Sequence, residues 1–146
     1  MAKRIGKFTI IELDDSGGTA RDISNDVTSV GGLGITADEV EVGGYQQDKY
    51  YLGARQDTPI TIEGLFNPTA TTGSHTVLSG IVGANTGRTL TIAIGSNATP
   101  TTGDPEFEAE MICTAYTPTF DLNGPATFSA TLMPVSSTLM TWGTKA

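Results

Sequence analysis

The sequence predicts an all-β domain: a β-sandwich or β-barrel with one short flanking α-helix and a long inter-strand loop. Two observations support this fold class. The chain has 18 glycines and many threonines, with only 16% charged residues, which is typical of strands joined by tight turns. Several short segments also alternate apolar and polar residues, with turn residues between them. The length of 146 residues fits one domain, 1–146, whose N-terminal and C-terminal segments we expect to be flexible.

Strands are expected over four segments of the first half, the last of which is the clearest: 7–13, 21–30, 39–42 and 58 onward. In the last segment Ile60 and Ile62 point to one face. Thr61 and Glu63 point to the other, so one face is apolar and one is polar. Segment 43–57 is polar and does not alternate, so we expect the long loop there.

The second half predicts one helix, over residues 74–82, and further strands. A stripe of apolar residues recurs in the helix with helical spacing: Val77, Leu78, Ile81 and Val82. Ser74 is placed to cap the first turn of this helix. Alternation then predicts the remaining strands, of which the last is short: 89–94, 107–115, 126–132 and 138–142.

Residue types that carry catalysis or hold metal ions are sparse. His75 is the only histidine and Cys113 the only cysteine, so neither a zinc site nor an intramolecular disulfide is expected. We expect His75 in a surface or capping role and Cys113 as a buried, unreactive thiol. The first residues lack the pattern of a signal peptide, and no apolar run is long enough to span a membrane. The sequence therefore predicts a protein that is not an enzyme, binds no cofactor and contacts no membrane.

Acidic residues outnumber basic ones, with a formal net charge of −8, and no Lys or Arg occurs between Thr89 and Thr144. This balance disfavours a protein that binds nucleic acid tightly. Glu108 and Glu110 lie two residues apart on a predicted strand, so both project from one face. Two interpretations stay open for them. They are either a carboxylate pair for glycoside hydrolysis, which normally needs a cleft with aromatic side chains, or an acidic stripe on a solvated face.

Aromatic residues are concentrated in the expected loop, next to a leucine: Tyr45, Tyr50, Tyr51 and Leu52. Exposed aromatic side chains in a loop often mark an interface, so contact with another subunit is one interpretation. The other is that these side chains fold back and plug the core of the domain.

Residues 39–67, EVEVGGYQQDKYYLGARQDTPITIEGLFN, resemble the middle of the major tail tube proteins of long-tailed, siphovirus-type bacteriophages. In that family a short strand leads into a long loop or hairpin, followed by a glycine with a nearby basic residue. The next strand ends in Gly-aromatic-Asn/Asp. Here these features are Gly53 with Arg55, and then Gly64-Leu65-Phe66-Asn67. The short helix and the late segment FSATLMPVSS are also similar.

The resemblance implies a structural virion protein that polymerises as stacked, hexameric rings into the tail tube, a conduit for genome ejection. It implies that the partners are further copies of the chain and the tape measure, terminator and distal tail proteins. DNA would pass without specific binding, and the protein would be in the virion tail, after the host cytoplasm. The expected inter-subunit loop includes Tyr45, Lys49, Tyr50, Tyr51, Leu52 and Arg55. The expected lumen-facing side chains are Glu63, Glu108, Glu110, Thr127, Ser129 and Thr131.

Two alternative functions stay open. One is a related tube or tail-completion component, such as a terminator, of a contractile or secretion machine. The other is a carbohydrate-binding β-sandwich. A tube component predicts self-assembly into rings or tubes, whereas a sugar-binding domain predicts a monomer whose melting temperature rises with sugar.

Overall fold

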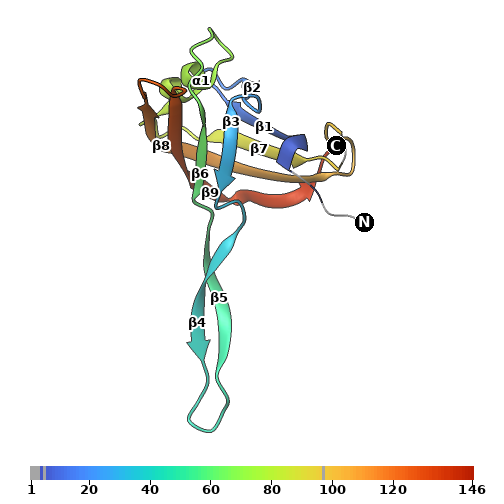
Figure 1. The fold of residues 1–146 in the computed structure, drawn as a ribbon. Helices are drawn as coiled ribbons and strands as arrows, with labels where there is room; N and C mark the ends of the chain where they lie inside the picture. Colours follow the sequence, from blue (N-terminus) through green and yellow to red (C-terminus); the bar gives the residue numbers. More distant parts are fainter. Residues whose placement is uncertain (1–3, 5, 97) are drawn as a thin grey trace.

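The computed structural model describes residue 4, residues 6–96 and residues 98–146, with the backbone alone for 136–139. Strands make up most of the described chain (Figure 1). In chain order the elements are the 3-10 helix η1 (Gly6–Phe8), β1 (Thr9–Asp14), β2 (Ala20–Asp22), β3 (Val27–Gly31), β4 (Thr36–Val42), β5 (Tyr50–Asp57), β6 (Ile60–Leu65), α1 (Ser74–Ile81), β7 (Arg88–Ile94), β8 (Pro105–Thr119) and β9 (Thr127–Thr144).

The strands of the main sheet bury the apolar side of the predicted alternation. In β6, Ile60 and Ile62 are fully buried, while Thr61 and Glu63 are exposed. β8 buries its own apolar set in the same way: Phe107, Ala109, Met111 and Cys113. These side chains join those of α1 in one core cluster. Burying one large apolar side chain stabilises the fold by about 1.5–3 kcal/mol, so this cluster is the main source of stability.

Seven strands form one antiparallel sheet in the order β2-β1-β7-β8-β9-β6-β3, which confirms the predicted all-β class. β8 and β9 have 15 and 18 residues and therefore belong to both halves of the sheet. Their pairing shifts register at three places between Glu108 and Ala115, and such bulges let a sheet bend. The sheet curls around the core into an open barrel. β1 and β3 line the opening, a hollow of about 450 Å³.

Segment 43–57 is a loop only as far as residue 49, because residues 50–57 form β5. β4 and β5 pair from Thr36 opposite Asp57 to Val42 opposite Tyr50, and form a hairpin separate from the main sheet. Figure 1 shows this hairpin projecting from one end of the curled sheet. The prediction was wrong for residues 50–57 because apolar alternation arises where one face of a strand is buried, and every residue of β5 is exposed.

Helix α1 begins at Ser74, as predicted, but Ser74 does not cap it. Gly73 is the N-cap residue, and the Ser74 hydroxyl instead donates to the Leu65 carbonyl at 2.9 Å. His75 lies partly at the surface, one of the two roles expected for it, and does not cap the helix. It is half-buried, and its Nδ1 lies 2.9 Å from the hydroxyl oxygen of Tyr116 in β8. Both side chains fasten the start of the helix to the sheet, a tertiary use of polar groups that local sequence does not reveal.

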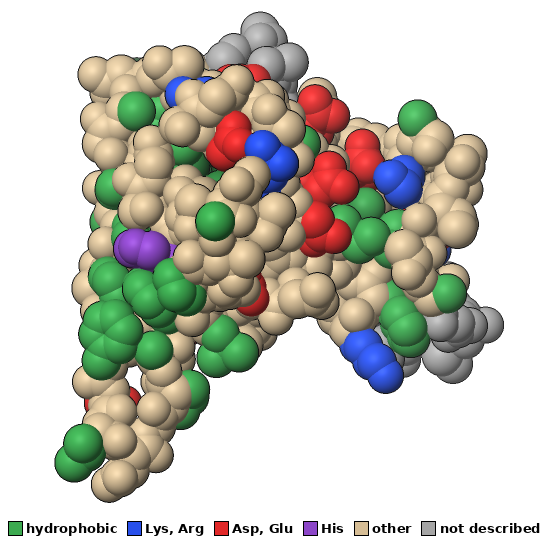
Figure 2. Space-filling view, turned by 90° about the horizontal axis from the view of Figure 1, so that it is seen from above, with side chains coloured by type: hydrophobic (Ala, Val, Ile, Leu, Met, Phe, Trp, Pro, Cys, Tyr) green, Lys and Arg blue, Asp and Glu red, His purple; other side chains and the backbone are tan. Residues whose placement is uncertain are grey.

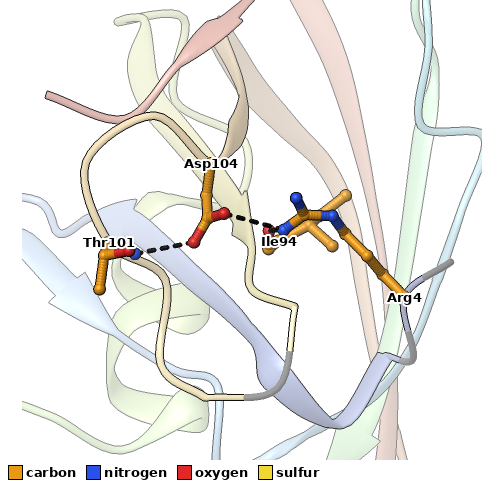
Figure 3. Close-up of polar contacts among 4 residues, drawn as sticks. All are labelled: Arg4, Ile94, Thr101 and Asp104. Atoms are coloured by element: carbon orange, nitrogen blue, oxygen red, sulfur yellow. Dashed lines mark hydrogen bonds and ion pairs between the residues drawn. The ribbon is translucent and has the colours of Figure 1, made fainter. Parts of the chain in front are cut away.

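Near its N-terminus the chain is held against the loop between β7 and β8. The Arg4 guanidinium donates to the Ile94 carbonyl and to the Asp104 carboxylate, each at 2.9 Å (Figure 3). The second carboxylate oxygen of Asp104 accepts from the Thr101 amide at 2.9 Å. The hydrogen bond from Thr101 and the Arg4 guanidinium lower the pKa of Asp104. Asp104 therefore stays ionised, and its ion pair with Arg4 persists, in moderately acidic solution.

The C-terminal residues meet the same loop. The Lys145 amide donates to the Asp104 carbonyl at 2.8 Å, and the Gly103 amide donates to the Lys145 carbonyl at 2.9 Å. One loop thus contacts both ends of the described chain. The flexibility of the terminal segments stays a prediction, and residues 1–3 and 5 lie outside the described chain.

Candidate assembly surfaces

In the described residues, no cluster of three or more His, Cys, Asp or Glu side chains could hold a metal ion. None of the helices in the same part of the chain is long and apolar enough to cross a membrane. Cys113 is buried, and this burial raises the pKa of its thiol, so little of the reactive thiolate forms at neutral pH. The distinctive features of the molecule are its exposed surfaces.

The hairpin has one apolar face. Residues directly opposite each other in a ladder share a face, and successive pairs alternate between the two faces. Val40 lies opposite Leu52, and Val42 lies opposite Tyr50, so these four side chains form what we call the apolar hairpin face. Val40 is 46% exposed, Tyr50 52% and Leu52 56%. A contiguous apolar face in water is typical of a surface that a partner covers.

The other face of the hairpin is polar. Glu41 pairs with Tyr51 on this face, and the Lys49 Nζ lies 3.9 Å from a Glu41 carboxylate oxygen. Arg55 lies where the register of the hairpin shifts, between Gly53 opposite Glu39 and Gln56 opposite Ala37, so it does not follow Tyr51 on this face. Both partners of the Lys49–Glu41 pair are mostly exposed, so the pair contributes little to stability.

The predicted inter-subunit residues therefore divide into four groups. Tyr50 and Leu52 lie on the apolar face, Lys49 and Tyr51 on the polar face, Arg55 at the register shift of β5, and Tyr45 at the hairpin tip. All three tyrosines are exposed, and Tyr45 is fully so. The interpretation in which they plug the core is wrong.

A row of carboxylates and hydroxyls crosses the outer face of one wall of the barrel. Strand pairing aligns it across β2, β1, β7, β8 and β9 as follows: Asp22, Glu12, Thr91, Glu108 and Thr141. Glu110 lies on the same side of β8, and its Oε2 accepts from the Thr89 hydroxyl at 3.2 Å. We call Asp22, Glu12, Glu108 and Glu110 the acidic wall. Sequence reasoning missed Glu12 and Asp22, although the alternation of Glu12 with two buried residues was a usable signal for Glu12.

The other predicted lumen residues lie on a different wall. Glu63 of β6 pairs with Ser129 of β9, and Ser129 also pairs with Thr117 of β8. Glu63, Ser129 and Thr127 line a hollow of about 320 Å³. Both walls turn their inner faces to the same core, so their outer faces point away from each other. The predicted lumen set is therefore split: Glu108 and Glu110 on one wall, and Glu63, Thr127, Ser129 and Thr131 on the other.

β9 presents an unpaired edge in the described chain. Its first part pairs with β6 on one side and with β8 on the other, whereas from Pro134 to Thr144 it pairs with β8 alone. The free side of this stretch carries backbone N–H and C=O groups without strand partners. Such an edge can accept a further strand from another chain.

No protein-family model matches the chain, and no curated protein matches its sequence. Solved structures match it by fold over its whole length. A chain of the anti-feeding prophage cap, a tube terminating cap, has a TM-score of 0.74 and 18% identity, covering 99% of this chain and 93% of that one. A chain of the sheath–tube complex of the PVC extracellular contractile injection system has a TM-score of 0.69 and 20% identity, covering 99% and 92%.

A third similar chain belongs to the tail of a gene transfer agent particle refined with C6 symmetry. Its TM-score is 0.69 and its identity 15%, covering 99% of this chain and 100% of that one. The protein therefore shares its fold with chains from tubes, terminators and tails of contractile injection systems and gene transfer agents.

Proposed function

We propose that the protein is a structural subunit that polymerises as stacked, hexameric rings into the tube of a phage-like tail, a conduit for genome ejection. The shared fold is consistent with this role. The finer assignment, to a siphovirus-type virion, rests on the sequence resemblance. In this role the partners are further copies of the chain and the tape measure, terminator and distal tail proteins, and the protein is located in the virion tail.

The observation that carries the proposal is the apolar hairpin face. A two-stranded hairpin is only marginally stable in water by itself. This one nevertheless leaves about half of Val40, Tyr50 and Leu52 in solvent. Packing against another copy would bury that face and stabilise the hairpin. The unpaired edge of β9 supplies a second contact, because strand addition between neighbours satisfies backbone groups on both chains.

The proposal places the acidic wall toward the lumen, since only one of the two walls can face a single channel. The electrostatic repulsion between a phosphate and one carboxylate about 10 Å away is only about 0.4 kcal/mol in water. Rings of carboxylates repeated along a tube add up these small repulsion energies. The chain has no Lys or Arg between Thr89 and Thr144 to offset them. Passing DNA would then not stick to the channel. Glu63, Thr127, Ser129 and Thr131 face outward in this arrangement.

A cryo-EM structure of the assembled tube tests which wall faces the lumen. Glu108→Lys is expected to make the lumen retain a short oligonucleotide where a nuclease cannot reach it. Glu63→Lys makes the same change of charge on the opposite wall and is expected to leave the lumen free of bound DNA. Protected DNA in Glu63→Lys tubes alone would reverse the assignment of the two walls.

A tube terminator is the second candidate, and the similarity to the anti-feeding prophage cap favours it. Electron microscopy of the concentrated, purified protein separates the candidates. Long tubes support a tube subunit, whereas rings that never elongate support a terminator. A strict monomer contradicts both. A sugar-dependent rise in its melting temperature would then point to a carbohydrate-binding domain.

A further inference from the structure

The end of the molecule opposite the hairpin carries a second exposed apolar surface. Phe120 and Leu122 lie in the turn between β8 and β9 and are 64% and 98% exposed. Phe66, just after β6, packs against Phe120 with ring centroids 5.1 Å apart. Figure 2 looks onto this end and shows hydrophobic side chains gathered beside the histidine. We call Phe66, Phe120 and Leu122 the turn patch.

The aromatic part of the turn patch is anchored to the core. The Phe66 ring lies 4.5 Å from the ring of His75, centroid to centroid, and the His75 ring lies 5.7 Å from that of Tyr116. Tyr116 in turn lies 5.7 Å from the buried Phe128. Because these rings are already ordered by packing, little side-chain freedom is lost when a partner covers them. Anchored aromatic side chains of this kind dominate the binding energy of protein interfaces.

The apolar hairpin face and the turn patch lie at opposite ends of the folded molecule (Figure 1). They cannot meet within one molecule. Two copies arranged head to tail bring them together, and each such contact leaves one apolar surface free at either end. A contact of this type does not close on itself when the copies are stacked by translation and rotation, so it continues into a filament.

One basic side chain beside the hairpin face can meet one acidic side chain beside the turn patch. Asp121 lies between Phe120 and Leu122, in a long stretch of the chain, from Thr89 to Thr144, that contains no Lys or Arg. At the hairpin tip, Lys49 precedes Tyr50 and is 75% exposed, and the carboxylate it contacts, that of Glu41, is 3.9 Å away. Opposite charges at the rim of a contact set its register and speed association.

We propose that the turn patch of one copy receives the apolar hairpin face of a copy in the next ring, with Lys49 beside Asp121. This inference rests on the proposed function and specifies which surfaces join the rings. The same two surfaces are used at every junction, so one contact between unlike ends builds the tube.

Two variants separate the two sides of the junction. Leu52→Asp disables the hairpin face, and Leu122→Asp disables the turn patch. Both residues are exposed, so both variants are expected to melt at the wild-type temperature and to form no tubes alone. Mixed in equal amounts they retain one working junction, so electron microscopy should show pairs of rings that do not elongate. Gln56→Asp, on the polar side of the hairpin opposite Ala37, is the matched control and should form wild-type tubes.

The outcomes distinguish this inference from the proposed function. Tubes of wild-type length from Leu122→Asp would overturn the inference alone, as would a mixture that yields no ring pairs. In either case the turn patch binds a different partner, such as a sheath or terminator protein. Wild-type protein that forms no tubes would overturn the proposed function and this inference together. Exchange of charges supplies a second measurement: Asp121→Lys should shorten tubes, and adding Lys49→Asp should restore part of the length.

Discussion

The curled sheet and the β4–β5 hairpin both place apolar side chains on one face, but only the sheet turns that face toward a core. Ile60 and Ile62 in the sheet are 0% exposed, whereas Val40 and Leu52 in the hairpin are 46% and 56% exposed. All four side chains are aliphatic, and the difference lies in what covers them. An apolar face on a strand therefore indicates a surface that becomes buried, but it does not indicate whether the same chain or another copy packs against it.

The largest difference between the two regions is expected for large-to-small substitutions. Phe107 is fully buried in β8, so Phe107→Ala should reduce the free energy of unfolding by roughly 3–5 kcal/mol. Leu52→Ala in the hairpin should change it by no more than about 0.5 kcal/mol, since exposed positions contribute little. Chemical denaturation followed by circular dichroism measures both. Equal losses in the two variants would show that the hairpin belongs to the folded core.

Glycine substitutions provide a smaller contrast. A Cβ at Gly64 in β6 would lie 2.2 Å from the Asp26 carbonyl oxygen, and the backbone there cannot yield easily. Gly64→Ala should destabilise the protein by roughly 1–3 kcal/mol, as overpacking does. A Cβ at Gly53 in β5 would meet Ala37 at an ordinary 3.8 Å, so Gly53→Ala should leave the melting temperature unchanged. A drop in melting temperature for Gly53→Ala would show that side chains pack closely around Gly53, which contradicts an open hairpin.

Hydrogen exchange tests whether the hairpin depends on assembly. In the unassembled protein the amides of β4 and β5 should exchange much faster than those of β8, because no buried side chains hold the hairpin closed. In assembled tubes the hairpin amides should become protected. Leu122→Asp protein, which should form no tubes at the same concentration, is the control. Hairpin amides as protected as those of β8 before assembly would contradict this dependence.

The smallest effect is expected from the ion pair at Asp104. The Thr101 amide and Arg4 lower the pKa of Asp104 below its ordinary value of 3.8, so the folded state holds the proton more weakly than the unfolded state. This contribution to stability is complete above that ordinary value and is lost as the pH falls through the lowered pKa. Asp104→Asn should therefore flatten the acid side of a plot of melting temperature against pH. An Asp104→Asn curve with the same acid side as the wild type would contradict this contribution.

Patterns along the sequence are sufficient to predict the all-β class, the position of the helix and the faces of the clearest strands. Ile60 and Ile62 are buried as predicted, and so is Cys113. Glu108 and Glu110 share a face of β8, with Glu108 exposed and Glu110 half-buried. All of these properties follow from spacing along a few neighbouring residues, with a period of two in strands and about 3.6 in a helix. Local periodicity is enough to decide them.

Which of these faces lie on the same wall depends on how the strands pair and bend. Glu12 joins Glu108 because β1 and β8 flank β7 in a particular register, and Glu63 is removed from them because the long strands bend around the core. The hairpin was hidden for a related reason: β5 buries no residue, so its sequence lacks the alternation that burial imposes. Strand order, register and curvature arise from contacts between residues far apart in the chain. These long-range contacts cannot be read from the spacing of neighbouring residues. They determine which surfaces are exposed for assembly.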